Sequence, residues 1–222
     1  MPSHVLSAVG TGDRPHAKNV PPRRWHGARL SKNGKPTVAY VLGEFCPFCA
    51  AESWSVIVAT SRFGTFKNLT TLQSSSMDVD PNTQTISFRY SHFHSRYLTF
   101  EPIVNEDTNH KRVEKVPPRV KRAWRQAEGN VLGYPFIDFA GRAVLVRPSF
   151  DAHLLHGLTR AQIAGDLACS SSPIAKAIDG TANQLTAAIC IATKNSPKRV
   201  CTKGPIPSIE KSFKALHRQS TT

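Results

Sequence analysis

The chain has 222 residues, with 29 Lys and Arg against 15 Asp and Glu, which gives a net charge of +14. Hydrophobic residues make up 40% and charged residues 20%, so a fibrous or wholly disordered protein is excluded and one sizeable domain is expected. The longest mainly apolar run has about eight residues, far short of the roughly 20 that span a bilayer, which excludes a membrane span in this sequence. The positive charge favours an anionic partner surface without selecting one.

Residues 1–35 contain several prolines and basic residues and show neither helical nor strand periodicity. We interpret them as an extended lead-in that packs on the domain through Trp25. A leader with a basic region followed by an apolar stretch is not visible at the start. Two interpretations stay open: Met1 is the native start, or an upstream segment that anchors the protein in a membrane is absent from this chain.

A strand, a tight turn and a helix form the first firm unit. The β-rich apolar run Thr37–Leu42 is typical of a central strand buried on both faces. It leads into Cys46-Pro47-Phe48-Cys49, where Pro47 suits the first turn of a helix because its missing N–H costs nothing there. Residues 50–62 then have helical spacing of apolar side chains.

The rest of the chain predicts further strands and helices. Strands are predicted over 67–73, 85–90 and 97–104, and two apolar segments around an Ala-Gly turn predict a hairpin over 133–146. Thr159 is a candidate N-cap of a helix, and Gly129 is expected to end one. Gly180 is expected to allow a break within another helix. Helices are predicted over 118–127, 158–167, 173–193 and 208–217.

The two cysteines at the strand–helix junction predict redox chemistry. A Cys-x-x-Cys pair can also bind a metal or have no role, so its position decides. The Cys46 sulfur would lie at a helix N-terminus, where unpaired N–H groups and the helix dipole stabilise a thiolate, the nucleophilic form. Cys49, one turn later, could resolve a mixed disulfide formed at Cys46. We therefore expect Cys46 to attack and Cys49 to resolve.

Two motifs resemble the thioredoxin superfamily: Phe45-Cys46-Pro47-Phe48-Cys49 after a hydrophobic strand, and Tyr134-Pro135-Phe136-Ile137-Asp138 at the start of a hairpin. The resemblance implies that Pro135 is a cis-proline packed against the cysteines, and that Tyr134, Pro47 and Phe48 contact the substrate. It is closest to a prokaryotic family of thioredoxin-like domains of unknown function, which also has a helix similar to residues 180–190. Many members of that family look exported or membrane-anchored.

The implied architecture is a thioredoxin-like α/β fold, a central mixed sheet flanked by helices, over residues 36–205. A helical elaboration is expected at about 155–200, and 206–222 is read as a basic C-terminal tail. One departure concerns proton transfer, because related enzymes commonly place a buried acid six residues before the first cysteine, where this chain has Tyr40. Glu44 is the nearest acidic candidate, and an exposed loop carboxylate is an equally good interpretation of it.

The remaining cysteines bear on the compartment. The resemblance implies a structural disulfide between Cys190 and Cys201; the alternative is two buried free thiols. Cys169 is expected to be a buried, inert thiol, with pairing to Cys190 or Cys201 as the minor alternative. Disulfides at both cysteine pairs would indicate an oxidising compartment, so we expect an extracytoplasmic protein.

His92 and His94 share one face of a predicted strand and could complete a zinc site with Cys46 and Cys49. The 43-residue separation from Cys49 to His92 is far longer than in usual zinc fingers, so we expect exposed histidines, no metal and no cofactor. The basic block 111–125 contains a single aromatic residue, which favours a solvated face near an anionic membrane over nucleic-acid binding.

These features predict a thiol–disulfide oxidoreductase that acts on substrate proteins with thiols or disulfides, with a membrane redox partner as a further candidate. The alternative is a redox-silent thioredoxin-like binding or scaffold domain. The intact cysteine pair together with Pro135 favours the enzyme. The sequence does not choose among oxidase, reductase and isomerase.

Overall fold

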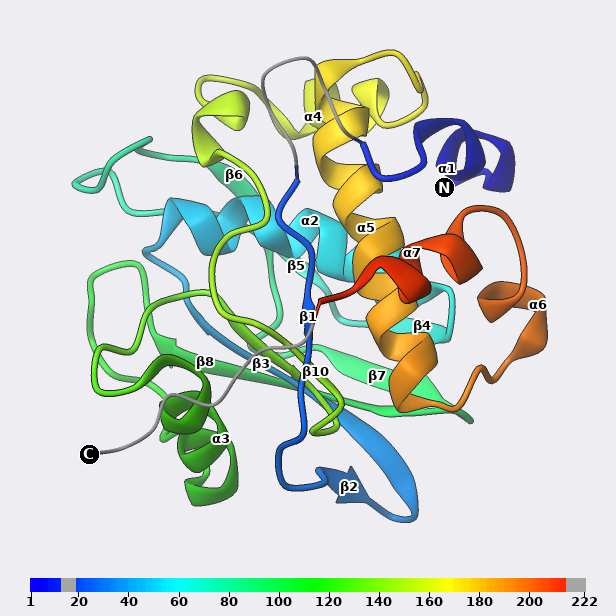
Figure 1. Cartoon of the computed structure of the whole chain (residues 1–222). Coiled ribbons are helices and arrows are strands. Elements are labelled where there is room, and N and C mark those ends of the chain that lie inside the picture. The colour runs from blue at the N-terminus through cyan, green and yellow to red at the C-terminus, as the bar shows by residue number, and fades with distance from the viewer. Residues whose placement is uncertain (13–18, 215–222) are drawn as a thin grey trace.

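The structure is a computed structural model that describes residues 1–12 and 19–214 (Figure 1). Its main sheet is mixed. The central strand β3 (Lys35–Gly43) pairs in parallel with β8 (Thr99–Glu106) and antiparallel with β9 (Phe136–Phe139). Beyond β9 lie β10 (Ala143–Leu145) and then β1 (Arg23–Arg24), while β2 (Ser31–Lys32) pairs with the start of β3.

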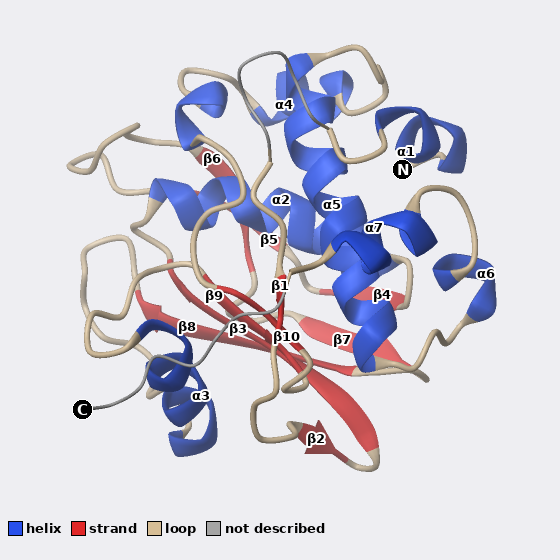
Figure 2. Ribbon diagram, viewed as in Figure 1, coloured by secondary structure: helices blue, strands red, loops and turns tan. Residues whose placement is uncertain are grey.

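Helices cover both faces of this sheet (Figure 2). Helices α2 (Pro47–Ser61) and α5 (Pro173–Ala192) pack on one face and α3 (Pro118–Glu128) on the other. Side chains of β3 alternate between the two cores: Val38, Tyr40 and Leu42 point to the first, Ala39 and Val41 to the second. The fold is therefore the predicted thioredoxin-like α/β arrangement, and β3 is the strand buried on both faces.

The other elements surround this core. They are α1 (Ser3–Val9), β4 (Gly64–Lys67) paired with β7 (His92–Ser95), β5 (Thr70–Gln73) paired with β6 (Gln84–Ser87), the 3-10 helix η1 (Ala152–Leu155), α4 (Arg160–Asp166), α6 (Lys198–Cys201) and α7 (Ile206–Ser212). None of the helices in the part of the chain that the structure describes is long and apolar enough to cross a membrane.

Local sequence signals explain several of these elements. Pro102 lies inside β8, which pairs only with β3 among the main strands, so its missing N–H can face away from the ladder. Thr159 caps α4 through a reciprocal capping box with Gln162. Gly129, with φ +80°, ends α3. The β9–β10 hairpin turns at Ala140 and Gly141, both with positive φ.

Three strand and lead-in predictions need correction. The strand expected over 67–73 is two strands, because Asn68 at φ +58° separates β4 from β5 and each pairs with a different partner. The strand expected over 85–90 ends at Ser87, and Tyr90 is exposed. The lead-in is not wholly extended, since it contains α1, although Trp25 is buried as expected.

Helix α5 runs unbroken through Gly180 (Figure 1). A Cβ at Gly180 would lie 2.5 Å from the Cα of Gly12, so this glycine allows a close approach of the N-terminal segment instead of ending the helix. The segment expected to be a basic tail begins with α7, whose Ile206 and Ile209 are buried; the predicted helix end at 217 lies outside the described residues.

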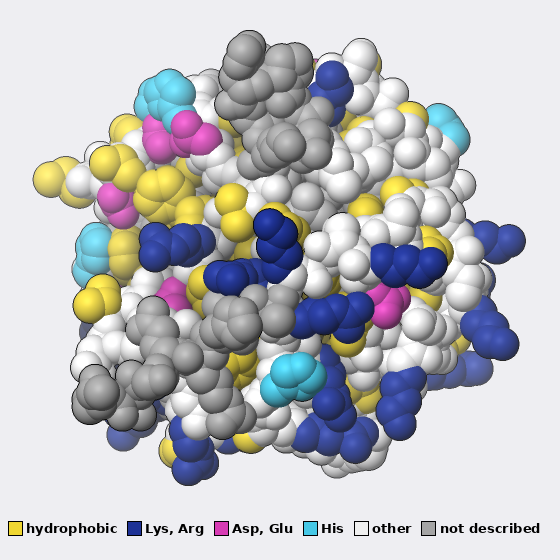
Figure 3. All heavy atoms as spheres, viewed as in Figure 1, with side chains coloured by type: hydrophobic (Ala, Val, Ile, Leu, Met, Phe, Trp, Pro, Cys, Tyr) yellow, Lys and Arg dark blue, Asp and Glu magenta, His cyan; other side chains and the backbone are white. Residues whose placement is uncertain are grey.

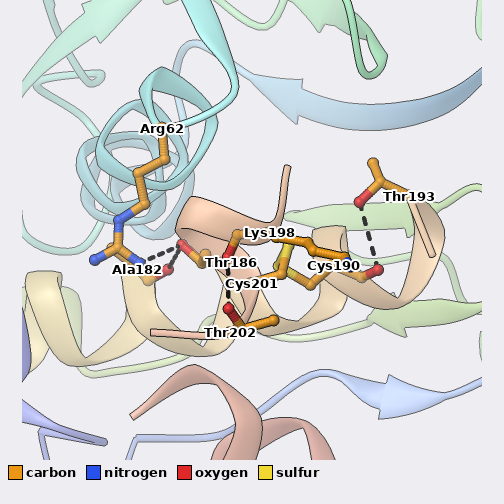
Figure 4. Close-up of a disulfide and its surroundings, with 8 residues drawn as sticks. All are labelled: Arg62, Ala182, Thr186, Cys190, Thr193, Lys198, Cys201 and Thr202. Atoms are coloured by element: carbon orange, nitrogen blue, oxygen red, sulfur yellow. Dashed lines mark hydrogen bonds between the residues drawn. A yellow bond between two sulfur atoms is a disulfide. The ribbon is translucent and has the colours of Figure 1, made fainter. Parts of the chain in front are cut away.

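A disulfide links Cys190 near the end of α5 to Cys201 at the end of α6 (Figure 4). Both residues are buried in the core beside α7. Arg62, the C-cap residue of α2, donates hydrogen bonds to Thr186 and Asn183 on α5. These bonds fasten the end of α2 to α5. The structure thus contains the disulfide that the resemblance implied.

Candidate active site

Cys46 is the N-cap residue of α2, and its sulfur accepts a hydrogen bond from the Cys49 N–H at 3.4 Å. Pro47 occupies the first helical position, as expected. A hydrogen bond from the Cys49 thiol, followed by the N–H groups of Cys49 and Phe48, lowers the pKa of Cys46 against the opposing effect of burial. Cys46 is only 5% exposed, so a reactant must approach closely to reach its sulfur.

Cys49 lies one turn deeper and has the opposite protonation preference. Burial, followed by the hydrogen bond to Cys46 and by its charge, raises the pKa of Cys49 well above the usual value. Tyr40 donates its hydroxyl hydrogen to the Cys49 carbonyl at 3.1 Å, and Ser53 donates to the same carbonyl at 2.7 Å. Tyr40 therefore steadies the backbone of Cys49.

Glu52 is a buried carboxylate that the sequence reasoning missed. It lies on α2 one turn after Cys49, is 1% exposed, and its charge contributes to raising the pKa of Cys49. Ser149 donates to it from the backbone N–H at 3.0 Å and the hydroxyl at 3.1 Å. Burial raises the pKa of Glu52 to about 7, so it can take or release a proton near neutral pH.

Glu44, the sequence candidate for proton transfer, is also buried, so its interpretation as an exposed loop carboxylate is wrong. It accepts a 2.6 Å hydrogen bond from the Ser87 hydroxyl, and its backbone N–H donates to the Glu106 carbonyl. These contacts join residues 44–46, the cysteine turn between β3 and α2, to β6 and β8. Glu44 is thus held by hydrogen bonds at this turn, and Glu52 is a carboxylate among the charges that act on Cys49.

The segment Tyr134–Pro135 borders the cysteine turn. The peptide bond between these residues is cis, and β9 begins one residue later, with Phe136 paired to Val41 near the end of β3. Since β3 runs directly into the cysteine turn, this register brings Tyr134 beside it, and the rings of Tyr134 and Phe45 lie 5.9 Å apart.

Two hollows adjoin Tyr134. One, of about 460 Å³, is lined by Phe48, Tyr134, Arg147 and the exposed Val131, among others. The second, of about 430 Å³, lies towards Lys121. The Tyr134 hydroxyl accepts a hydrogen bond from the Asn105 side chain and donates one to Glu106 at 3.0 Å, which fixes this ring where it lines both hollows. The first hollow, called the groove below, is thus lined by Phe48 and Tyr134, two of the three residues expected to contact substrate.

The remaining candidates lie elsewhere. Among the described residues, His92 and His94 do not join Cys46 and Cys49 in any three-residue cluster with metal-binding geometry. Trp124, inside the basic block, is buried and stacks on Phe136, so it offers no platform for a nucleic-acid base.

Cys169 is exposed, which corrects the expectation of a buried thiol. Its sulfur lies 3.1 Å from the Ser171 hydroxyl, and hydrogen bonds from Ser171 and Ser172 lower the pKa of Cys169. The residue follows α4 in a short turn before α5 and therefore lacks the buried setting of the cysteine pair. It is the described thiol most open to chemical modification.

These observations define a thioredoxin-like α/β protein with a dithiol pair at the start of a buried helix. The family model described as "Domain of unknown function (DUF929)" matches residues 24–191, and the chain belongs to that family. A search of curated proteins and a search of solved structures found no match.

Proposed function

We propose that the protein is a thiol–disulfide oxidoreductase that acts on protein cysteines through Cys46 and Cys49. The observation that carries the proposal is the contrast between the two sulfurs. Cys46 accepts the Cys49 N–H at the helix start and has a lowered pKa, while Cys49 is more deeply buried and has a raised one. A purely structural pair does not require this difference.

In the reducing direction, the Cys46 thiolate attacks a substrate disulfide. A bond forms between the Cys46 sulfur and one substrate sulfur, and the other substrate sulfur leaves as a thiolate. Cys49 then loses its proton and attacks Cys46, which forms the Cys46–Cys49 disulfide and releases the second substrate thiolate. Two electrons pass from the pair to the substrate. Oxidation of a substrate dithiol is the same sequence reversed, and a second dithiol or disulfide partner restores the pair.

Glu52 supplies a proton acceptor for the second step. Its carboxylate lies on the same helix one turn beyond Cys49, and its pKa of about 7 lets it accept a proton and release it again near neutral pH. The carboxylate is buried and accepts two hydrogen bonds from Ser149. We therefore assign to Glu52 the role that the sequence reasoning gave to Glu44.

The groove lined by Phe48 and Tyr134 suits a substrate segment in extended conformation. The exposed Val131 at its rim offers apolar contact, and Arg147 offers positive charge. The Cys190–Cys201 disulfide supports an oxidising, extracytoplasmic compartment, because such bonds persist there. The proposed partners are therefore secreted or membrane-exposed proteins with thiols or disulfides.

The two cysteines make an asymmetric test possible. Cys46→Ser is expected to abolish both reduction of insulin and oxidation of a reduced test protein. Cys49→Ser is expected to accumulate mixed disulfides, because attack survives while resolution does not. Both variants are made in a Cys169→Ser background, because the exposed Cys169 could form adducts of its own.

Adduct formation is followed by non-reducing electrophoresis and mass spectrometry of the linked peptide. A Cys49→Ser protein that traps no substrate, together with an inactive wild type, would support the binding or scaffold alternative. Equilibration with glutathione measures the potential of the pair and separates an oxidase from a reductase.

A further inference from the structure

Asp80, His153 and His156 bring three metal-ligating atoms together on the surface. One ligand atom from each residue lies within 4.8 Å of the other two. The Asp80 carboxylate oxygen is 2.6 Å from Nδ1 of His153 and 3.8 Å from Nδ1 of His156. This is the one such cluster found among residues 1–12 and 19–214.

Local backbone geometry explains why the two imidazoles lie together. His153 is in η1 and His156 is its C-cap residue, three positions later. Side chains three residues apart lie one above the other in a 3-10 helix, and the two rings are stacked with centroids 5.5 Å apart and planes 12° apart. Asp151 begins η1 by accepting the His153 backbone N–H at 3.0 Å.

Asp80 arrives from a distant part of the sequence. It lies in the connection between β5 and β6 with φ +48°, and its carbonyl accepts the Thr83 hydroxyl at 2.7 Å. Its side chain is largely covered, whereas both histidines are accessible. On the face drawn in Figure 3, histidine side chains adjoin acidic ones. The cluster therefore combines a fixed carboxylate with two rings open to solvent.

We propose that Asp80, His153 and His156 form a binding site for a divalent transition metal, with Zn²⁺ as the natural candidate. Two imidazoles and one carboxylate are ligands that zinc accepts at bond lengths of about 2.0–2.2 Å. Tetrahedral ligands at that length are about 3.3 Å from one another. The separations of 2.6 and 3.8 Å from the carboxylate to the two imidazoles bracket this value, and all three ligand atoms lie within 4.8 Å of one another, so side-chain rotations would complete the site.

The metal would join two segments that flank the cysteine pair. The connection holding Asp80 donates a backbone hydrogen bond from Ser75 to the Phe45 carbonyl at 2.9 Å, next to Cys46. The segment holding the histidines begins just after Ser149, which binds Glu52. A bound ion would therefore clamp residues 74–83 against 149–156 and steady both sides of the turn.

The test is a calorimetric titration with Zn²⁺ of protein in which Cys46, Cys49 and Cys169 are replaced by serine. Removing the free thiols excludes zinc bound at cysteine. We expect one equivalent to bind, and His153→Ala and His156→Ala each to weaken binding at least tenfold. His92→Ala is the matched control and should leave the affinity unchanged.

Two further measurements use the wild-type protein. Co²⁺ should bind without the thiolate-to-metal absorption band that cysteine ligands produce, and Zn²⁺ should slow amide hydrogen exchange in residues 74–83 and 149–156. No saturable zinc binding, or binding that survives both His153→Ala and His156→Ala, would overturn the proposal. A thiolate band in the Co²⁺ spectrum that is lost in Cys46→Ser would place the metal at the cysteines and overturn it also.

Discussion

Glu52→Gln probes the buried carboxylate one helical turn after Cys49, the proposed resolving cysteine. In the wild type, Ser149 donates to Glu52 from both its N–H and its hydroxyl. A glutamine can keep the backbone bond to its carbonyl oxygen and donate its NH₂ group to the Ser149 hydroxyl. The substitution therefore removes the ionisable group with little loss of hydrogen bonding or volume.

Burial raises the pKa of Glu52 from 4.5 to about 7, which makes its ionisation unfavourable for the folded state. Between these values the folded protein holds a proton that the unfolded chain has released, so stability falls as pH rises through this window. Above pH 7 the loss is complete, and at 1.36 kcal/mol for each pH unit it comes to about 3 kcal/mol. Glu52→Gln lacks this loss.

We expect the variant to match the wild type in stability at pH 4.5 and to exceed it by up to about 3 kcal/mol at pH 8, measured by urea unfolding. Asp138 and Asp179 also have pKa values raised to about 7 by burial, so the wild type retains a pH dependence from them. The difference between the two proteins isolates Glu52. If the free energies of unfolding of the two proteins change with pH in parallel, the reasoning is refuted.

The same variant tests the chemical role. If Glu52 accepts the Cys49 proton, the rate at which the wild type resolves a mixed disulfide should show an inflection near pH 7, the pKa of this carboxyl. Glu52→Gln should lose the inflection and resolve more slowly at pH 8 despite its higher stability. A gain in stability with an unchanged rate profile would leave Glu52 as a structural residue and contradict the proton-transfer role.

Two further substitutions test the packing. Replacing Cys190 and Cys201 by serine opens a loop with a sequence separation of 11. The chain-entropy relation predicts that the free energy of unfolding, measured by thermal unfolding, falls by about 2–3 kcal/mol. Gly180→Ala should lower the free energy of unfolding by about 1–2 kcal/mol. The added methyl group would clash with the backbone of Gly12, and this destabilises the fold by more than the higher helix propensity of alanine stabilises it. Gly165→Ala, at a helical glycine with no atom near its Cβ position, is the matched control and should be neutral or stabilising; equal effects at both glycines would contradict the close-approach interpretation.

Local pattern in the sequence determined the elements that position the cysteines. A continuous β-rich run predicts β3, proline after the first cysteine predicts the start of α2, and an Ala-Gly turn predicts the β9–β10 hairpin. Each of these signals acts over a few neighbouring residues, through apolar periodicity or a restricted backbone angle. The lowered pKa of Cys46 follows from the same local geometry, because hydrogen bonds from Cys49 and Phe48 cause it, and this is why the attacking thiol could be predicted; the raised pKa of Cys49 needs burial as well.

Tertiary structure alone decided the contacts between distant segments. Ser149 reaches Glu52 across 97 positions and His153 reaches Asp80 across 73, and no pattern near either residue indicates its partner. Burial also reversed local interpretations, since Gly180 permits a close contact and Glu44 is enclosed by β6 and β8. The physical reason is that burial and charge–charge distance depend on how elements pack, whereas periodicity and capping depend only on neighbours along the chain.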